Sequence, residues 1–243
     1  MARKRIDVLL VERGLLESRA KAQAAIAAGR VSLDGAWVAK GSQTVDEAAS
    51  LIVEPADDWV GRGALKLAHA LALWPIDVRG KVVLDVGAST GGFTEVCLRA
   101  GAAEVFAVDV GRGQLHPRVA ADGRVVALEG VDARNLTPAV IDAAPQLIVC
   151  DASFIGLAKV LPAALALAAP AADLLALVKP QFEVGPALVG KGGVVKDEAA
   201  RLKAVADVRA FLESAGWSVR EVAQSPVTGG DGNVEYLLWA SLG

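Results

Sequence analysis

The stretch VLDVGASTGGFTE, residues 83–95, decides the fold of this chain. An apolar run that contains Asp85 leads into a turn with Gly87, Gly91 and Gly92, and residues suited to a helix follow. A strand, a glycine turn and a helix N-terminus in that order let a ligand approach the backbone closely and meet unpaired N–H groups. We therefore expect a cofactor-binding site at this turn.

Further apolar runs follow the same pattern along the chain. They are EVFAVDVG (104–111), RVVALEG (124–130), QLIVCDAS (146–153) and LLALVKP (174–180), with helical segments between most of them. Buried strands that alternate with helices predict a parallel, doubly wound sheet. WSVREVAQS (217–225) and NVEYLLWAS (233–241) come after a helix expected to begin near Asp197, and they raise the predicted number of strands to seven, the last one antiparallel. The predicted fold class is α/β, with a Rossmann-like doubly wound seven-stranded sheet in residues 61–243.

Acidic residues lie at or near the ends of the first three strands. Asp85 precedes the first glycine, Asp109 ends the second strand 109 − 85 = 24 residues later, and Asp132 follows the third. A carboxylate like Asp109 accepts hydrogen bonds from ribose hydroxyls, while Asp85 can hold an ammonium group and Asp132 can flank an adenine amine. A nicotinamide-binding chain favours G-x-G-x-x-G, so the pattern favours S-adenosylmethionine over a dinucleotide. A purely structural turn leaves the acids unexplained. The predicted cofactor-binding residues are Asp85, Gly87, Ser89, Thr90, Gly91, Gly92, Phe93, Asp109, Asp132 and Asp151.

A lysine ends the fifth strand, in LLALVKPQFEVG (174–185). Taking the charge of Lys179 out of water is costly, so this residue needs a partner or a function. Asp151 ends the fourth strand, and adjacent parallel strand ends bring the two side chains close together. Lys66 is expected on the helix before the first strand and Glu235 at the start of the last one. Lys66 and Glu235 could each be a solvated charge, but two lysines and two acids in one cleft indicate a catalytic site.

The first 40 residues differ in charge from the rest. They hold eight Lys/Arg and four Asp/Glu, a local charge of +4, whereas residues 41–243 hold 25 − 8 = 17 basic and 28 − 4 = 24 acidic residues, a local −7. Two short helices, the second from an N-cap at Ser18 to Gly29, and a hairpin at Asp34-Gly35 predict a small α+β domain. The polar connector EPADDWVGRG (54–63) follows, so we place the first domain, with its linker, at residues 1–60.

This first segment resembles the S4 RNA-binding domain. The resemblance rests on Arg5-Ile6-Asp7, Ser18-Arg19, Ile26 to Val31 and the turn at Gly35. It implies a phosphate-binding surface, and a solvated helix face is the alternative interpretation. The predicted RNA-binding residues are Arg3, Lys4, Arg5, Arg19, Lys21, Arg30, Lys40 and Arg62.

Nearly the whole chain resembles the hemolysin A (TlyA) family, S4-domain-containing ribosomal RNA 2′-O-methyltransferases with an FtsJ-like catalytic domain. The blocks that carry this resemblance are Arg62-Gly63 through Lys66-Leu67, DVGASTGGFT (85–94), AVDVGRGQLH (107–116), CDASFI (150–155), LVKPQFEVG (177–185), GKGGVVKD (190–197) and GNVEYL around Glu235. The resemblance implies a methyltransferase sheet, S-adenosylmethionine as cofactor and ribosomal RNA or a ribosomal subunit as partner. It also implies the catalytic set Lys66, Asp151, Lys179 and Glu235. The target it implies is a cytidine of 23S rRNA, in some members also of 16S rRNA.

Lys179 is the expected general base. A ribose hydroxyl must lose its proton when it attacks a methyl group, and a lysine takes that proton only when neutral. Burial, nearby Lys66 and a sulfonium favour the neutral amine, whereas Asp151 favours the ammonium, so we expect Asp151 to orient Lys179 and the hydroxyl.

Other features limit the choice of function. No apolar stretch is long enough to span a membrane, the N-terminal apolar run stops at Glu12, and Cys97 and Cys150 show neither metal spacing nor a disulfide framework. We expect a cytoplasmic protein without a metal, and no oligomeric state is predicted. The alternatives are a cytolysin, a non-catalytic RNA-binding ribosome-assembly factor and a small-molecule methyltransferase. The loop at 182–198, with Lys191 and Lys196, is expected to contact RNA, and a mobile connector is the alternative.

Overall fold

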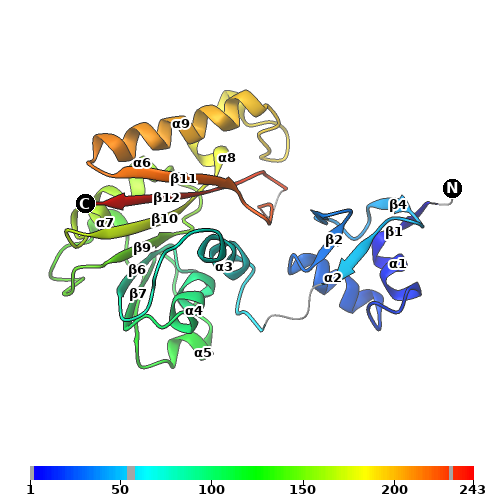
Figure 1. Cartoon of the computed structure of the whole chain (residues 1–243), viewed down its shortest axis with the longest axis horizontal. Helices are drawn as coiled ribbons and strands as arrows, with labels where there is room; N and C mark the ends of the chain where they lie inside the picture. Colours follow the sequence, from blue (N-terminus) through cyan, green and yellow to red (C-terminus); the bar gives the residue numbers. More distant parts are fainter. Residues whose placement is uncertain (1–2, 54–57, 230–231) are drawn as a thin grey trace.

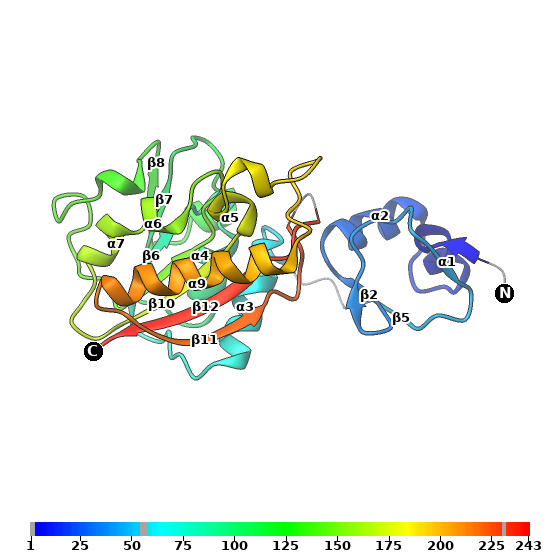
Figure 2. The same cartoon turned by 90° about the horizontal axis from the view of Figure 1, so that it is seen from above.

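The chain forms two bodies (Figures 1 and 2). A computed structural model describes residues 3–53, 58–229 and 232–243. In chain order the smaller body contains β1 (Arg3–Arg5), α1 (Ile6–Glu12), α2 (Arg19–Ala27), β2 (Val31–Leu33), β3 (Ala36–Trp37), β4 (Thr44–Asp46) and β5 (Leu51–Val53). The larger body contains α3 (Gly63–Leu73), β6 (Val82–Val86), α4 (Gly92–Arg99), β7 (Glu104–Asp109), α5 (Pro117–Ala120), β8 (Val125–Glu129), η1 (Ala133–Asn135), β9 (Leu147–Cys150), α6 (Leu157–Val160), α7 (Pro162–Ala166), β10 (Ala172–Val178), α8 (Pro180–Glu183), η2 (Pro186–Leu188), α9 (Glu198–Ser214), β11 (Ser218–Gln224) and β12 (Tyr236–Leu242).

The smaller body confirms the two predicted helices and the hairpin. The Ser18 side chain accepts a hydrogen bond from the backbone N–H of Lys21 and caps α2. Between β2 and β3, Asp34 and Gly35 have φ values of 48° and 84°, as a tight hairpin turn requires. One face each of α1 and α2 packs on the small sheets, around the fully buried Ile6 and Leu10.

The larger body contains the predicted seven-stranded sheet, in the order β11-β12-β10-β9-β6-β7-β8. The five strands β10, β9, β6, β7 and β8 are parallel, and β12 runs antiparallel to both β10 and β11, as expected for the last strand. Helices cover both faces (Figure 1): α6, α7 and α9 lie on one, and α3, α4 and α5 on the other. Strand β10 is almost entirely apolar because both its faces are buried.

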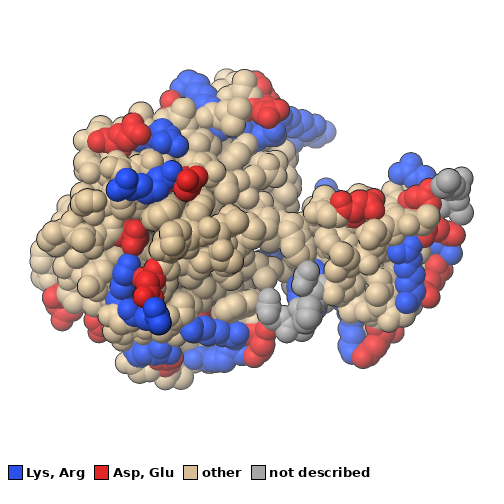
Figure 3. Space-filling view, viewed as in Figure 1, with Lys and Arg blue, Asp and Glu red and all other residues tan. Residues whose placement is uncertain are grey.

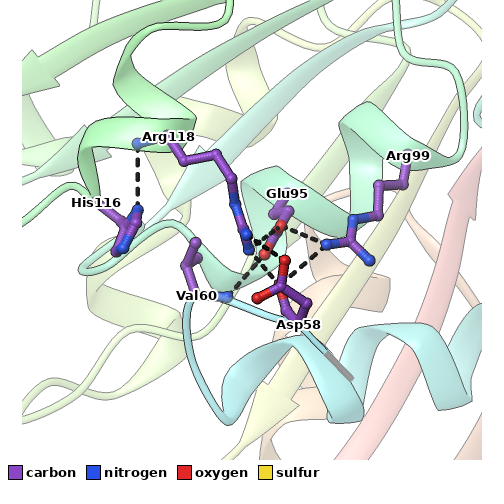
Figure 4. A network of polar contacts seen from close by, with 6 residues as sticks. All are labelled: Asp58, Val60, Glu95, Arg99, His116 and Arg118. Atoms are coloured by element: carbon purple, nitrogen blue, oxygen red, sulfur yellow. Dashed lines mark hydrogen bonds and ion pairs between the residues drawn. The ribbon is translucent and has the colours of Figure 1, made fainter. Parts of the chain in front are cut away.

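Residues 58–60, in the second half of the predicted connector, contact the larger body through hydrogen bonds and an ion pair (Figure 4). Glu95 on α4 is 5% exposed and accepts hydrogen bonds from the backbone N–H of Val60 (2.8 Å) and from Arg99 and Arg118 (2.8 Å each). The Arg99 guanidinium also lies 4.1 Å from the ring centroid of Trp59. Residues 58–60 therefore belong physically to the larger body. The rest of the predicted connector includes 54–57, which lie outside the described residues, so the division at 60/61 stays a prediction.

The two bodies touch near the start of α3. A Cβ atom on Gly29 would lie 3.3 Å from Val227 Cγ1 and 3.5 Å from Leu65 Cδ1. None of the helices in the described ranges is both long and apolar enough to cross a membrane.

Candidate active site

Two adjoining cavities lie beyond the carboxyl ends of the parallel strands. One, of about 260 Å³, is lined by residues that include Lys66, Lys179 and Thr228. The other, of about 550 Å³, is lined by residues that include Asp109 and Asp132. The two cavities share Gly87, Ser89, Asp151 and Ser153. The sheet therefore brings most of the predicted cofactor residues to these two cavities, together with Lys66, Asp151 and Lys179 of the predicted catalytic set.

Lys179 is held at the rim of β10, as predicted. Because β10 and β9 are parallel neighbours, Lys179 and Asp151 follow adjacent strand ends. The Lys179 Nζ lies 2.7 Å from Asp151 Oδ1, and it donates to the Asp151 carbonyl oxygen (2.9 Å) and to Ser153 Oγ (2.7 Å). The residue is 6% exposed. Its amine is thus removed from bulk solvent and fixed by three oxygen atoms.

Lys66 and Glu235 form a second buried pair. Lys66 Nζ donates to Glu235 Oε2 at 2.6 Å, and the two residues are 7% and 3% exposed. Lys66 lies on α3, as predicted, while Glu235 immediately precedes β12 instead of starting it. A Cβ on Gly229 would lie 2.6 Å from Glu235 Oε1, so the glycine leaves the carboxylate its space. The four predicted catalytic residues therefore form two lysine–carboxylate pairs, of which Lys66–Glu235 is buried and Lys179–Asp151 is half-buried on its carboxylate side.

The glycine turn is built without room for side chains. Gly87 has a φ of 83°, and a Cβ there would lie 2.8 Å from the Cα of Ala152. Gly91 has a φ of 90°, and a Cβ there would meet Leu115 Cδ1 at 2.8 Å. Ser89 also has a positive φ, of 47°, and lines both cavities. Thr90, Gly92 and Phe93 line the smaller cavity, whereas Gly91 lines neither of the two.

Asp109 and Asp132 both line the larger cavity; Asp109 ends β7, and Asp132 lies three residues beyond β8, at the N-terminus of η1. The Asp109 carboxylate accepts from the backbone N–H groups of Ser89 (2.8 Å) and Gly111 (2.7 Å), which fix its orientation. Asp132 forms an ion pair with Arg134 (2.6 Å), and the hydrogen bonds from Arg134 lower the pKa of its carboxyl group. Both carboxylates keep lone pairs that a ligand can use.

Asp85 lies behind the glycine turn and lines neither cavity. It is fully buried, and the hydroxyl of Thr94 on α4 donates to its Oδ2 at 2.6 Å. Burial raises the pKa of Asp85 to about 7, against the lowering effect of the Thr94 hydrogen bond, and the charges of Asp151 and Asp109 raise it further. Direct binding of the cofactor's ammonium group by Asp85, as expected from the sequence, stays a prediction.

Sequence reasoning missed several residues of the site. Ser153 follows Asp151 by two positions in the CDASFI block, and a hydroxyl there was the available signal. Phe154 is 91% exposed, has a φ of 65° and lines the larger cavity, with its ring centroid 5.2 Å from that of Phe182. Val227 and Thr228 line the smaller cavity from a loop without a recognisable motif.

Most of the predicted RNA-binding side chains are engaged within their own domain. Arg3 donates to the Thr44 carbonyl oxygen (2.9 Å), Lys4 pairs with Glu12 (2.8 Å) and Glu47 (3.1 Å), Lys21 pairs with Glu17, and Arg5 and Arg19 pair with Asp7. On the face shown in Figure 3, acidic and basic side chains alternate over the smaller body. Arg62 is placed differently, because it lines the smaller cavity and two hollows between the bodies. Arg30 lines one of those hollows and Lys40 the other. RNA contact by all eight residues stays a prediction.

The loop at 182–198 is tied to the segment that carries Glu235. Asn233 is 1% exposed, accepts from the Val195 backbone N–H (3.0 Å) and donates to the Gly193 carbonyl oxygen (2.8 Å). Contact of this loop with RNA stays a prediction. In the described part of the chain, no group of three or more His, Cys, Asp or Glu side chains could hold a metal ion.

The parallel sheet, the glycine turn and the two cavities beyond the strand ends are those of an enzyme of the S-adenosylmethionine-dependent methyltransferase class. Residues 59–242 match the model of the FtsJ-like methyltransferase family, and residues 4–50 match that of the S4 domain. The chain therefore belongs to the FtsJ-like methyltransferase family, within the hemolysin A (TlyA) group that also carries an S4 domain.

Similar proteins support this grouping along the whole chain. The 16S/23S rRNA (cytidine-2′-O)-methyltransferase TlyA of Mycobacterium tuberculosis is 49% identical, over 98% of this chain and 90% of that protein. Hemolysin A of Brachyspira hyodysenteriae is 35% identical, over 96% of this chain and 98% of that protein. A solved structure of a hemolysin candidate from Streptococcus thermophilus has a TM-score of 0.76 and 36% identity, and the match covers 100% of this chain and 89% of that one.

Proposed function

We propose that this chain methylates the ribose 2′-hydroxyl of a cytidine in ribosomal RNA, in the cytoplasm. The proposed target is 23S rRNA, with 16S rRNA as a second substrate to be tested. The observation that carries the proposal is the buried amine of Lys179, fixed at the rim of β10 within 2.7 Å of Asp151 Oδ1 and beside the glycine turn. The names of the similar rRNA methyltransferases support the same substrate.

The residues of the larger cavity are suited to holding S-adenosylmethionine. A cavity of about 550 Å³ lies within the range of small-molecule sites. Asp109 would accept hydrogen bonds from the ribose hydroxyls and Asp132 would lie near the adenine. The backbone at Gly87 and Ser89 would lie against the methionine part, towards the smaller cavity. When bound, the cofactor supplies an activated methyl group. The chain's own residues must then position the RNA hydroxyl and take its proton.

Lys179 is the proposed general base. In its neutral form the Lys179 amine would accept the proton of the 2′-hydroxyl when the ribose oxygen takes the methyl group supplied by the cofactor, which would leave as a neutral thioether. The Asp151 carboxylate would stabilise the ammonium that forms. Ser153 Oγ would keep the amine aimed into the cavity. The Lys66–Glu235 pair would hold the ribose from the other side, because Lys66 lines the same cavity.

Phe154 is proposed to receive a base of the RNA. It is the most exposed large hydrophobic side chain among the described residues, and it follows Ser153 directly. Its positive φ is costly for a bulky residue, and such strain is common at functional sites. An exposed aromatic ring stacks with any nucleic-acid base. Phe154→Ala should raise KM for RNA, whereas Phe154→Tyr should preserve it.

The proposal is tested by transfer of labelled methyl groups to ribosomal subunits. Lys179→Met should lower kcat by about 10²–10⁴-fold, the usual contribution of a general base, and should keep cofactor binding measured by calorimetry. The matched control is Lys81→Met. Lys81 also pairs with an aspartate, Asp173 at 2.9 Å, but at the opposite ends of the strands, so its loss should leave turnover unchanged. Lys179→Met with wild-type turnover would refute the assignment, and RNA without label from the wild-type chain would refute the function.

A further inference from the structure

Asp7 is a fully buried carboxylate that the proposed reaction leaves unused. It lies in the first turn of α1, in the smaller body, far along the chain from the catalytic pairs. Arg5 holds it with two hydrogen bonds, Nε to Oδ1 and Nη2 to Oδ2, both 2.9 Å. Arg19 Nη2 and Gln23 Nε2 each donate to Oδ2 at 3.1 Å. A buried charge with this many donors is well compensated, and the Arg5 hydrogen bonds hold the pKa of Asp7 well below its usual range.

The two arginines that hold Asp7 face outward. The side chains of Arg5 and Arg19 are 43% and 57% exposed, while that of Asp7 is 0% exposed. Each guanidinium has five N–H donors, and Asp7 uses only some of them. Within the described residues, Arg5 Nη1 and Arg19 Nη1 make no further hydrogen bond. One buried carboxylate thus holds two guanidinium groups side by side at the surface with donors to spare.

The exposed ion pairs of the same domain are built differently. In the pair of Lys21 and Glu17 both side chains are largely exposed, at 59% and 80%, so the carboxylate neutralises the lysine in water without fixing it. Asp7 cannot meet an RNA strand itself, because no part of its side chain is exposed. Its effect on RNA must therefore pass through Arg5 and Arg19.

We propose that Asp7 is a positioning residue that prepares Arg5 and Arg19 to bind one phosphate group of the RNA backbone. The inference rests on the proposed function, because it requires the S4 domain to bind RNA. A guanidinium can hold a carboxylate with one edge and a phosphate with another, which a lysine cannot do. Ordering a long side chain costs free energy on binding, and here that cost is met when the domain folds.

The test compares two substitutions that each remove one negative charge from the same domain. If charge alone matters, Asp7→Asn and Glu17→Gln both strengthen binding to an RNA fragment, because RNA is an anion. If Asp7 positions the arginines, Asp7→Asn weakens binding by about tenfold, from the ordering cost of two long side chains. Glu17→Gln should tighten binding, by at most about threefold. Weaker RNA binding by Asp7→Asn together with tighter binding by Glu17→Gln supports the proposal. Tighter or unchanged binding by Asp7→Asn overturns it.

Further measurements separate positioning from folding and from the proposed function itself. Thermal unfolding is followed for each variant, and Gln23→Ala, which removes a neutral donor to the same carboxylate, should change RNA affinity by less than about twofold. If Asp7→Asn does not fold, Arg19→Lys tests the proposal instead. This variant keeps the positive charge but loses the planar guanidinium, and it should bind RNA about fivefold more weakly than the wild type. Equal binding by Arg19→Lys overturns the proposal. A wild-type chain without salt-dependent RNA binding would instead contradict the proposed function.

Discussion

The substitution Asp85→Asn removes a carboxylate that the fold buries at a cost. In the folded chain burial raises the pKa of Asp85 to about 7, from an ordinary value of 3.8. At a pH between these two pKa values, Asp85 is protonated in the folded chain and ionised in the unfolded chain. Stability therefore falls as the pH rises from about 4 to about 7, and the loss is complete above that range.

The magnitude follows from the two pKa values. Their difference of 7 − 3.8, about 3, corresponds to about 4 kcal/mol at about 1.4 kcal/mol per pKa unit. About 2.5 kcal/mol of this falls between pH 5 and pH 8. Asparagine still accepts the Thr94 hydrogen bond but buries an amide without partners, which costs about 1–3 kcal/mol at every pH. A comparison between two pH values cancels that constant cost.

The assay is urea unfolding of both proteins at pH 5 and pH 8. The free energy of unfolding of the variant minus that of the wild type should be about 2.5 kcal/mol larger at pH 8 than at pH 5. In thermal unfolding the same change corresponds to about 5–10 °C in Tm for a domain of this size. Asp122→Asn serves as control, because hydrogen bonds from Arg124 lower the pKa of Asp122 and its effect is confined to acid pH. A stability difference that is the same at pH 5 and pH 8 for Asp85→Asn would refute the reasoning.

Three further predictions concern other parts of the larger body. Gly87→Ala should lower cofactor affinity and Tm together, since a Cβ would lie 2.8 Å from the Ala152 Cα at a φ of 83°, and calorimetry and thermal unfolding measure both effects. Glu95→Gln should destabilise the chain by about 1–3 kcal/mol in urea unfolding, because it removes the buried carboxylate that Arg99 and Arg118 share and leaves Arg118 only the exposed Asp58, and an unchanged midpoint would show that this ion-pair cluster contributes little to stability. Cys97 and Cys150 should not react with a thiol reagent until the chain unfolds, since burial raises both pKa values, that of Cys150 to about 12.

The sequence predicted the sheet and one of the two proposed catalytic pairs for a definite reason. In parallel neighbours the strand ends are aligned, so the apolar runs that end at Asp151 and Lys179 necessarily bring these residues together. The pairing of Lys66 with Glu235 joins residues 169 positions apart, and no local pattern specifies it. Ser153 was missed because a hydroxyl two residues beyond a strand is common in any loop.

Side-chain direction explains the other differences. Asp85 alternates with Leu84 and Val86 on β6 and therefore points towards α4, where Thr94 meets it, instead of into a cavity. Arg5 and Arg19 read as free surface cations, but the sequence does not reveal that the Asp7 carboxylate lies between them. The hydropathy pattern of the sequence predicts where strands end, whereas the partners of charged side chains depend on how the helices pack in three dimensions.

The position of β12 has a consequence for biosynthesis. This strand follows β10 and β11 in the sequence but lies between them in the sheet, and Glu235 comes just before it. A growing polypeptide that has not yet reached residue 235 leaves the edges of both neighbours open, and Lys66 lacks its Glu235 partner. If Lys66 and Glu235 act as proposed, catalytic competence is acquired late in synthesis, and an incomplete translation product should be inert.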